Sequence, residues 1–159
     1  MNSLTINANS PVSTRRIGEA VGKALGSGDV VLLAGPLGAG KTTLTQGLAL
    51  GLGITESVMS PTFVLMRELK GRLPLYHLDL YRLENLPEIS DLGLDDYFYG
   101  DGVTVVEWAD RAGVLLPEEH LRVDLEYAGN RSRSLCFTAR GERYEQLLTG
   151  LAARFEAKS

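Results

Sequence analysis

A glycine-rich loop placed between an apolar run and a helical segment constrains this chain more than any other feature. The apolar run "DVVLLA" (Asp29 to Ala34) leads into "GPLGAGKT" (Gly35 to Thr42), which fits the pattern G-x-x-x-x-G-K-[ST]. A continuous apolar run is typical of a strand that is buried on both faces in a parallel sheet. The segment from Lys41 to Leu52, closed by Gly53, has the pattern of a helix. Strand, loop and helix together predict a phosphate-binding loop.

The residue types of this loop define its chemistry. Its glycines allow positive φ angles, so the backbone N–H groups turn inward as an anion nest, and the start of the helix adds its dipole. Lys41 is expected to reach the β- and γ-phosphates of a nucleotide, and the Thr42 hydroxyl to ligate the magnesium that bridges them. Thr43 can donate to the α-phosphate. The alternative, a glycine-rich turn that only joins strand to helix, does not account for the lysine and the hydroxyls.

A nucleotide site also needs an acid close to the magnesium, and two strands end in one. "VTVVE" ends in Glu107, and "LPLYHLD" ends in Asp79, with His77 two residues earlier on the same strand face. The residues alone do not rank the two acids, because Asp79 can also cap a helix and Glu107 can be a solvated carboxylate. We assign no chemical role to His77, or to Trp108, for which the core is the expected place.

The order of elements predicts one α/β domain over residues 1–159. The turn-rich segments "YFYGDG" (Tyr97 to Gly102) and "AGNRSR" (Ala128 to Arg133) are expected to be exposed loops. The predicted elements are a strand at Ser3–Ala8, a helix capped by Ser13 or Thr14 and ending before Gly26, the strand at Asp29–Ala34, the helix at Lys41–Leu52, strands at Phe63–Leu69, Leu73–Asp79, Val103–Glu107, Leu121–Tyr127 and Ser134–Thr138, and a final helix at about Glu142–Phe155.

Charge and composition limit the other function classes. The formal net charge is −4 and the basic residues are scattered, so any role with nucleic acid is expected to be indirect. No apolar stretch approaches the roughly 20 residues that span a bilayer, which makes a membrane role unexpected and a reducing cytoplasm the default. The single cysteine, Cys136, lies in an apolar stretch and is predicted to be a buried thiol. No lysine stands in an N-K-x-D stretch of the kind that selects guanine, so ATP is favoured.

Four motifs in a fixed order carry a family resemblance over nearly the whole chain. They are "GPLGAGKTTLTQGL", "SPTF" (Ser60 to Phe63), "HLDLYRL" (His77 to Leu83) and "VEWAD" (Val105 to Asp110). In this order they resemble the TsaE (YjeE) family, the bacterial ATPases of tRNA threonylcarbamoyladenosine synthesis. The resemblance implies a P-loop NTPase-like three-layer fold with a mainly parallel central sheet that binds ATP and Mg²⁺. It also implies work with the proteins TsaD and TsaB, while TsaC supplies the activated threonylcarbamoyl group and tRNA is met only indirectly.

Roles carried over by position complete the predicted site. Glu107, with Thr42, would hold magnesium, and Asp79 would lie beside the γ-phosphate and help orient the attacking water or the water shell of the metal. Thr62 in the "SPTF" segment would sense the γ-phosphate, although Pro61 and Phe63 can equally set a turn and anchor it. The resemblance implies that the phosphates are held by Gly38, Ala39, Gly40, Lys41, Thr42 and Thr43.

The edges of the resemblance are less regular. Pro36 stands where the family often has an acidic residue, and it lacks an N–H that could join the nest. Thr14 and Arg131 fall where the family has a threonine and an arginine near the base. Both are predicted contacts on the adenine side, with a helix cap and a surface charge as the respective alternatives.

Two other functions use the same loop. A small-molecule kinase would clamp the transferred phosphate with lid arginines, for which Arg131, Arg133 and Arg140 are the candidates. A nucleotide-gated binding module would use ATP only to order a surface for a partner. The fate of the γ-phosphate separates these alternatives from an ATPase.

Overall fold

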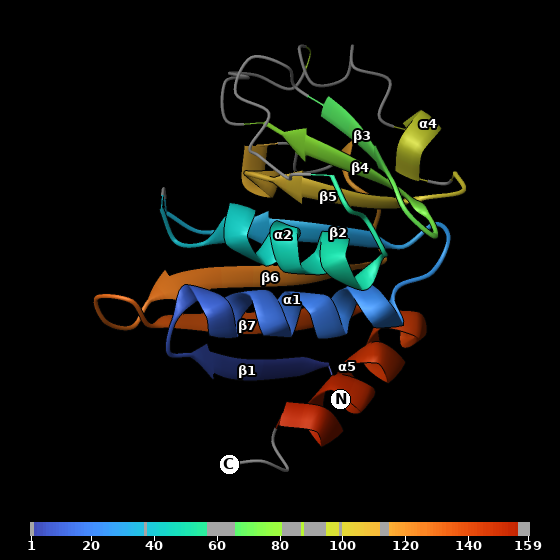
Figure 1. The fold of residues 1–159 in the computed structure, drawn as a ribbon. Helices are drawn as coiled ribbons and strands as arrows, with labels where there is room; N and C mark the ends of the chain where they lie inside the picture. Colours follow the sequence, from blue (N-terminus) through green and yellow to red (C-terminus); the bar gives the residue numbers. More distant parts are fainter. Residues whose placement is uncertain are drawn as a thin grey trace.

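A seven-stranded mixed sheet organises the computed structural model, in the order β1-β7-β6-β2-β5-β4-β3 (Figure 1). The structure describes residues 2–36, 38–56, 66–80, 87, 95–98, 100–111 and 115–155. The central strand β2 pairs in parallel with β5 and β6, and β5 pairs in parallel with β4, whereas the outer pairings of β1, β7 and β3 are antiparallel. The elements are β1 (Ser3–Ala8), α1 (Pro11–Ala24), β2 (Val30–Ala34), α2 (Lys41–Gly51), β3 (Met66–Lys70), β4 (Pro74–Asp79), α4 (Asp95–Phe98), β5 (Val103–Glu107), the 3₁₀ turn η1 (Ala109–Arg111), β6 (His120–Tyr127), β7 (Arg133–Arg140) and α5 (Glu142–Phe155).

These elements confirm the predicted α/β class with a parallel central sheet. β2 is buried along its whole length, as its apolar run predicts. The predicted start of the first helix is wrong, because α1 begins at Pro11. Ser10 is its N-cap and accepts a hydrogen bond from the Ser13 N–H, and proline suits the first helical position since no acceptor is needed there.

Two further predictions are corrected, and one lies partly outside the described residues. Phe98, predicted in an exposed loop, belongs to the short helix α4 and is buried, because it packs in the second core cluster. Cys136 is only partly buried, since on β7 it alternates with Leu135 and Phe137, which face the main core. The strand predicted at Phe63–Leu69 is described only from Met66 onward.

The two faces of the sheet carry two apolar clusters. Helices α1, α2 and α5 contribute to the larger one, which includes Val31, Leu33, Val123 and Phe137 from the strands. The smaller cluster lies on the opposite face and joins β2, β4 and β5 to α4 and η1. In Figure 1, α1 and α2 lie side by side across the sheet, and α5 lies toward the β1 edge.

Glycines bring α1 and α2 into close backbone contact. A Cβ added to Gly18 would lie 2.4 Å from the Leu44 carbonyl oxygen, and one added to Gly47 would lie 2.1 Å from the Arg15 carbonyl oxygen. Gly22 and Gly51 meet the other helix in the same way one turn further along. Because residue numbers rise together on the two helices, the helices run in the same direction. The first turn of α2, which carries the phosphate-loop lysine, is therefore fixed against α1.

Tyr144 anchors α5 to the start of the central strand. Its hydroxyl accepts a hydrogen bond of 2.9 Å from the Val30 N–H, and Arg143 beside it forms an ion pair of 2.8 Å with Asp29. Burial raises the pKa of Tyr144 to about 12, and the Val30 hydrogen bond opposes this shift. The tyrosine therefore stays neutral in the folded chain at pH values where it ionises in the unfolded chain.

This anchor predicts a distinctive pH dependence for Tyr144→Phe. The variant should lose about 1–3 kcal/mol of unfolding free energy at pH 7, because the buried Val30 N–H loses its acceptor. A raised pKa contributes stability that is complete below about pH 10 and declines as the pH approaches 12, and only the parent chain carries this contribution. Urea unfolding from pH 7 to pH 11.5 should show the difference narrowing by roughly 2 kcal/mol. A constant difference would contradict the role of Tyr144.

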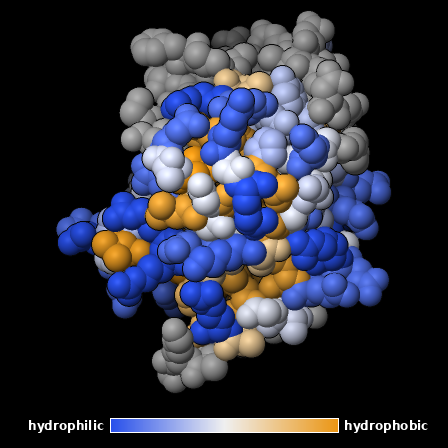
Figure 2. Space-filling model, turned by 45° about the vertical axis from the view of Figure 1, so that its right-hand side comes forward, coloured by the Kyte–Doolittle hydropathy of each residue, from blue (hydrophilic) through white to orange (hydrophobic). Residues whose placement is uncertain are grey.

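Large apolar side chains are exposed only singly in the described part of the chain. They are Val12 on α1, Leu50 on α2 and Tyr127 at the end of β6. Figure 2 shows one face of the molecule, on which hydrophilic side chains surround smaller hydrophobic areas. Among the described helices, none combines the length and apolar character needed to cross a membrane.

Candidate nucleotide site

The predicted site residues lie at one edge of the sheet. The parallel strands β2, β4, β5 and β6 all end at this edge, so Ala34, Asp79, Glu107 and Tyr127 lie at neighbouring strand ends. The loop from β2 to α2 leaves from the same edge. The carboxyl ends of parallel strands are the usual place for a ligand in an open α/β sheet.

The loop has the backbone of an anion nest. Gly38 and Gly40 have φ angles of +80° and +105°, and Gly40 is the N-cap of α2 without a side chain that caps the helix. The first N–H groups of a helix have no partner within it, so those of α2 are available to a phosphate. Gly35 is required for another reason, since an added Cβ would lie 2.4 Å from the Leu125 carbonyl oxygen.

Lys41 lies under the loop and is 5% exposed. Its ammonium donates to the carbonyl oxygens of Gly35 at 2.7 Å and Pro36 at 2.9 Å. Burial lowers the pKa of Lys41, and the charges of Glu107 and Asp79 partly offset this shift. The two predicted acids thus both act on the charge of the phosphate-loop lysine.

The two acids are direct neighbours. Asp79 and Glu107 are partners in the register of β4 and β5, and Glu107 is also the register partner of Leu33 on β2. Glu107 is 3% exposed and lies 2.5 Å from the Nε2 of His77, whereas Asp79 is only half-buried. The structure therefore brings Lys41, Asp79 and Glu107 together, as the sequence predicts.

Three aromatic or basic residues without a predicted role in ATP hydrolysis also lie here. Trp108 has an unusual φ of +60° and places its ring 4.2 Å from the Lys41 ammonium. The Tyr127 hydroxyl lies 2.9 Å from where a Gly38 Cβ would be. Arg133 stacks on the Tyr127 ring at 4.6 Å and approaches the Gly38 carbonyl at 3.5 Å. For Trp108, its position directly after Glu107 is a sequence signal that places it near the site. For Tyr127 and Arg133, local sequence gives no such signal.

The remaining predicted residues are less central in this structure. Thr14 is buried in the first turn of α1, level with the start of α2, and Arg131 is exposed in the turn between β6 and β7. Thr42 and Thr43 are half-buried in the first turn of α2, and Ala39 is buried in the loop. Thr62 and the rest of "SPTF" lie outside the described residues.

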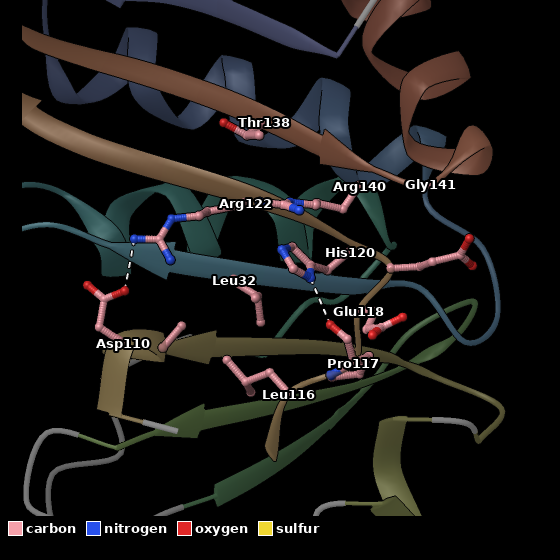
Figure 3. A pocket seen from close by; sticks show the side chains of 12 residues that line it. Leu32, Asp110, Leu116, Pro117, Glu118, His120, Arg122, Thr138, Arg140 and Gly141 are labelled. Atoms are coloured by element: carbon pink, nitrogen blue, oxygen red, sulfur yellow. Dashed lines mark hydrogen bonds and ion pairs between the residues drawn. The ribbon is translucent and has the colours of Figure 1, made fainter. Parts of the chain in front are cut away.

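The kinase alternative requires its three candidate arginines to converge, and Arg140 lies apart from Arg131 and Arg133. Arg133 begins β7 at the loop edge, whereas Arg140 ends β7, roughly 23 Å away at about 3.3 Å per residue. Arg140 lines a separate cavity of about 930 Å³ on the face of the sheet opposite to α1 and α2 (Figure 3).

Two polar side chains of this second cavity contact other residues of its lining. Arg122 forms an ion pair with Asp110 at 2.9 Å, and His120 donates from Nδ1 to the Pro117 carbonyl oxygen at 2.8 Å (Figure 3). Arg122 also forms an ion pair with Asp124 at 3.0 Å. Burial lowers the pKa of His120, and the Pro117 hydrogen bond opposes this.

A glycine nest at the carboxyl edge of a parallel sheet, closed by a helix that begins with lysine, defines the class of phosphate-loop nucleotide-binding proteins. Residues 8–135 match the family model described as threonylcarbamoyl adenosine biosynthesis protein TsaE. The chain therefore belongs to the TsaE family, which acts in tRNA threonylcarbamoyladenosine biosynthesis. Membership of this family implies nucleotide binding.

Individual relatives agree with this assignment. The tRNA threonylcarbamoyladenosine biosynthesis protein TsaE of Bacillus subtilis is 49% identical over 143 residues, which are 89% of each chain. TsaE of Treponema pallidum is 46% identical over 77% of this chain and 90% of its own. The crystal structure of Bacillus subtilis YdiB superposes with a TM-score of 0.84 at 42% identity, covering 96% of this chain and 95% of the other. The fold predicted from the family resemblance is thus confirmed.

Proposed function

We propose that this protein binds Mg²⁺ and ATP at the loop from Gly35 to Thr42 and hydrolyses ATP slowly, in support of the TsaD–TsaB machinery that forms threonylcarbamoyladenosine in tRNA. The observation that carries the proposal is the buried Lys41 ammonium, enclosed by the glycine loop and flanked by two carboxylates. The Lys41 ammonium can exchange its hydrogen bonds to backbone carbonyl oxygens for hydrogen bonds to phosphate oxygens, because charged phosphate oxygens are stronger acceptors.

The residues at this edge suit magnesium. Thr42 offers a hydroxyl and Glu107 a carboxylate, and hard oxygen ligands are the kind that Mg²⁺ prefers. No group of three or more His, Cys, Asp or Glu side chains in the described residues could hold a metal by itself. In the proposed site, phosphates and waters complete the coordination. Bound magnesium would neutralise phosphate charge, while Asp79 orients the attacking water and Lys41 binds the β- and γ-phosphates.

The fate of the γ-phosphate tests this proposal against its alternatives. With ATP labelled in the γ-phosphate, an ATPase releases labelled inorganic phosphate. A small-molecule kinase leaves the label on an acceptor, and a pure binding module releases almost none over many binding cycles. Arg133 at the loop rim does not by itself favour the kinase, because it is held by the Tyr127 ring and the Ser132 carbonyl oxygen at 2.8 Å.

The two acids should separate in their magnesium dependence. Glu107→Gln removes a metal ligand, so nucleotide affinity should respond less to added Mg²⁺. If the Asp79 carboxylate orients the attacking water, Asp79→Asn should keep a nucleotide affinity close to that of the parent chain and slow hydrolysis about 10²- to 10⁴-fold. Calorimetric titration with a non-hydrolysable ATP analogue, with and without Mg²⁺, measures the first effect and phosphate release the second. Loss of the magnesium response in Asp79→Asn alone would reverse the two roles.

A further inference from the structure

A buried histidine contacts the acid proposed as the metal ligand. His77 has no exposed surface, and its Nε2 lies 2.5 Å from the Oε2 of Glu107, which is 3% exposed. Both residues face the α2 side of the sheet, because His77 and Glu107 each lie two residues after a main-core residue of the same strand, Leu75 and Val105 respectively, and so share its face. The pair is therefore enclosed between the sheet and the helix that follows the phosphate loop.

The second ring nitrogen of His77 determines where the proton lies. Nδ1 is buried and has no hydrogen-bond partner in the described part of the chain. A proton on Nδ1 alone would be a buried donor without an acceptor, and it would leave Nε2 as an acceptor facing a carboxylate oxygen, which also only accepts. The neutral ring with its proton on Nε2 is thus the favoured form, and it donates to the Glu107 carboxylate.

We propose that His77 is a positioning residue whose Nε2–H holds Oε2 of Glu107, so that the carboxylate keeps one orientation toward the magnesium of the bound nucleotide. The inference rests on the proposed function, since it assigns a supporting partner to the metal acid. Asp79 is the register neighbour of Glu107, and the buried imidazole of His77 contacts the Glu107 carboxylate. A donor that fixes a ligating carboxylate commonly contributes 10- to 100-fold to metal affinity.

Packing alone does not explain this residue. An apolar side chain would fill the space of the ring without burying an unpaired nitrogen, but it would leave the buried carboxylate without its donor. His77 is also too enclosed to exchange a proton with solvent, so a role as general base for the attacking water is not supported. The hydrogen bond to Glu107 is the function that its surroundings permit.

The first test needs no ligand and uses the parent chain. The sequence has two histidines, so nitrogen NMR of ¹⁵N-histidine-labelled protein resolves both rings, and the variant His120→Gln assigns them. We expect His77 to carry its proton on Nε2 and His120, which donates to Pro117, to carry its own on Nδ1. A proton on Nδ1 of His77 would overturn the inference.

The second test uses amides of two lengths. In His77→Gln the amide nitrogen can reach the position of Nε2, whereas in His77→Asn it stays near the position of Nδ1. The affinity of each chain for a non-hydrolysable ATP analogue is measured over a magnesium chloride series, together with its melting temperature without nucleotide. We expect His77→Asn to raise the Mg²⁺ concentration that gives half of the increase in analogue affinity by about 10- to 100-fold. In His77→Gln this concentration should stay close to that of the parent chain.

The outcomes of the second test distinguish a failure of the inference about His77 from a failure of the proposed function. If both variants lower the melting temperature but keep the magnesium response of the parent chain, His77 is only structural and the inference is wrong. If His77→Gln is as impaired in its magnesium response as His77→Asn, the Nε2–H donor is not what matters, and the inference is equally wrong. If the parent chain binds the analogue without any magnesium response, the proposed function itself fails at this point.

Discussion

Replacing Gly47 by alanine is expected to lower the free energy of unfolding by about 1–3 kcal/mol or more. The new Cβ would lie 2.1 Å from the Arg15 carbonyl oxygen and 2.9 Å from its carbonyl carbon, all of it backbone of α1. Backbone cannot rotate away as a side chain can, so α2 must move relative to α1. Because α2 begins with Lys41, the displacement should also weaken nucleotide binding. Chemical denaturation and analogue titration measure the two effects.

Gly150 supplies the matched control for this substitution. It lies in α5, is exposed and has no atom within 4 Å of an added Cβ. Gly150→Ala should stabilise the chain by up to about 1 kcal/mol, because alanine is the better helix former. Equal stability of the two alanine variants would show that α1 and α2 are not packed as closely as described.

Lys41→Ala should weaken ATP binding by roughly 10- to 150-fold, because a charge-assisted hydrogen bond contributes about 1.5–3 kcal/mol. The reason is the position of its ammonium beneath the loop, where it donates to the Gly35 and Pro36 carbonyl oxygens and is proposed to bind phosphate instead when ATP is present. Lys23→Ala is the control, since Lys23 is an exposed lysine on α1 that forms an ion pair with Glu19 at 3.5 Å. Calorimetry with ATP and Mg²⁺ measures the difference, and equal affinity of the two variants would contradict the site.

Thr42→Ala is expected to behave differently from Lys41→Ala. Its hydroxyl is proposed to ligate magnesium, which neutralises charge that develops in the transition state, so turnover should fall more than binding. The ratio of the loss in turnover to the loss in affinity distinguishes the two variants. A Thr42→Ala chain that keeps full turnover would remove the hydroxyl from the metal site.

Much of the fold and the core of the site follow from local patterns. The apolar run from Asp29 to Ala34 fixes the central parallel strand, and the glycine spacing that follows it fixes the loop, because both need only neighbouring residues. The strand ends at Asp79 and Glu107 were predicted for the same reason. That they become direct neighbours depends on the strand order β2-β5-β4, which periodicity does not contain.

Contacts between distant segments could not be predicted from local pattern. Arg133 and Tyr127 reach the loop only because β6 and β7 form a hairpin that ends at its rim. Local pattern does not single out the start of α1, because Ser13 and Thr14 are as suitable for capping as Ser10, and it is Pro11 at the first helical position that favours Ser10 as the N-cap. The partly exposed Cys136 reflects which side of β7 faces the helices, which depends on tertiary packing.

Steady-state phosphate release, with and without TsaD and TsaB, tests the central claim most directly. Phosphoryl transfer depends on cations placed against the γ-phosphate, and an arginine supplied in trans can raise the rate roughly 10³- to 10⁵-fold. Here Lys41 and the magnesium are the cations that the loop motif provides, and Arg133 is held at the rim by its own turn. We therefore expect slow release by the chain alone, strong stimulation by the partner pair, and tighter partner binding with an ATP analogue than with ADP. Fast release by the chain alone, unchanged by TsaD and TsaB and with equal partner affinity in every nucleotide state, would contradict the proposed function.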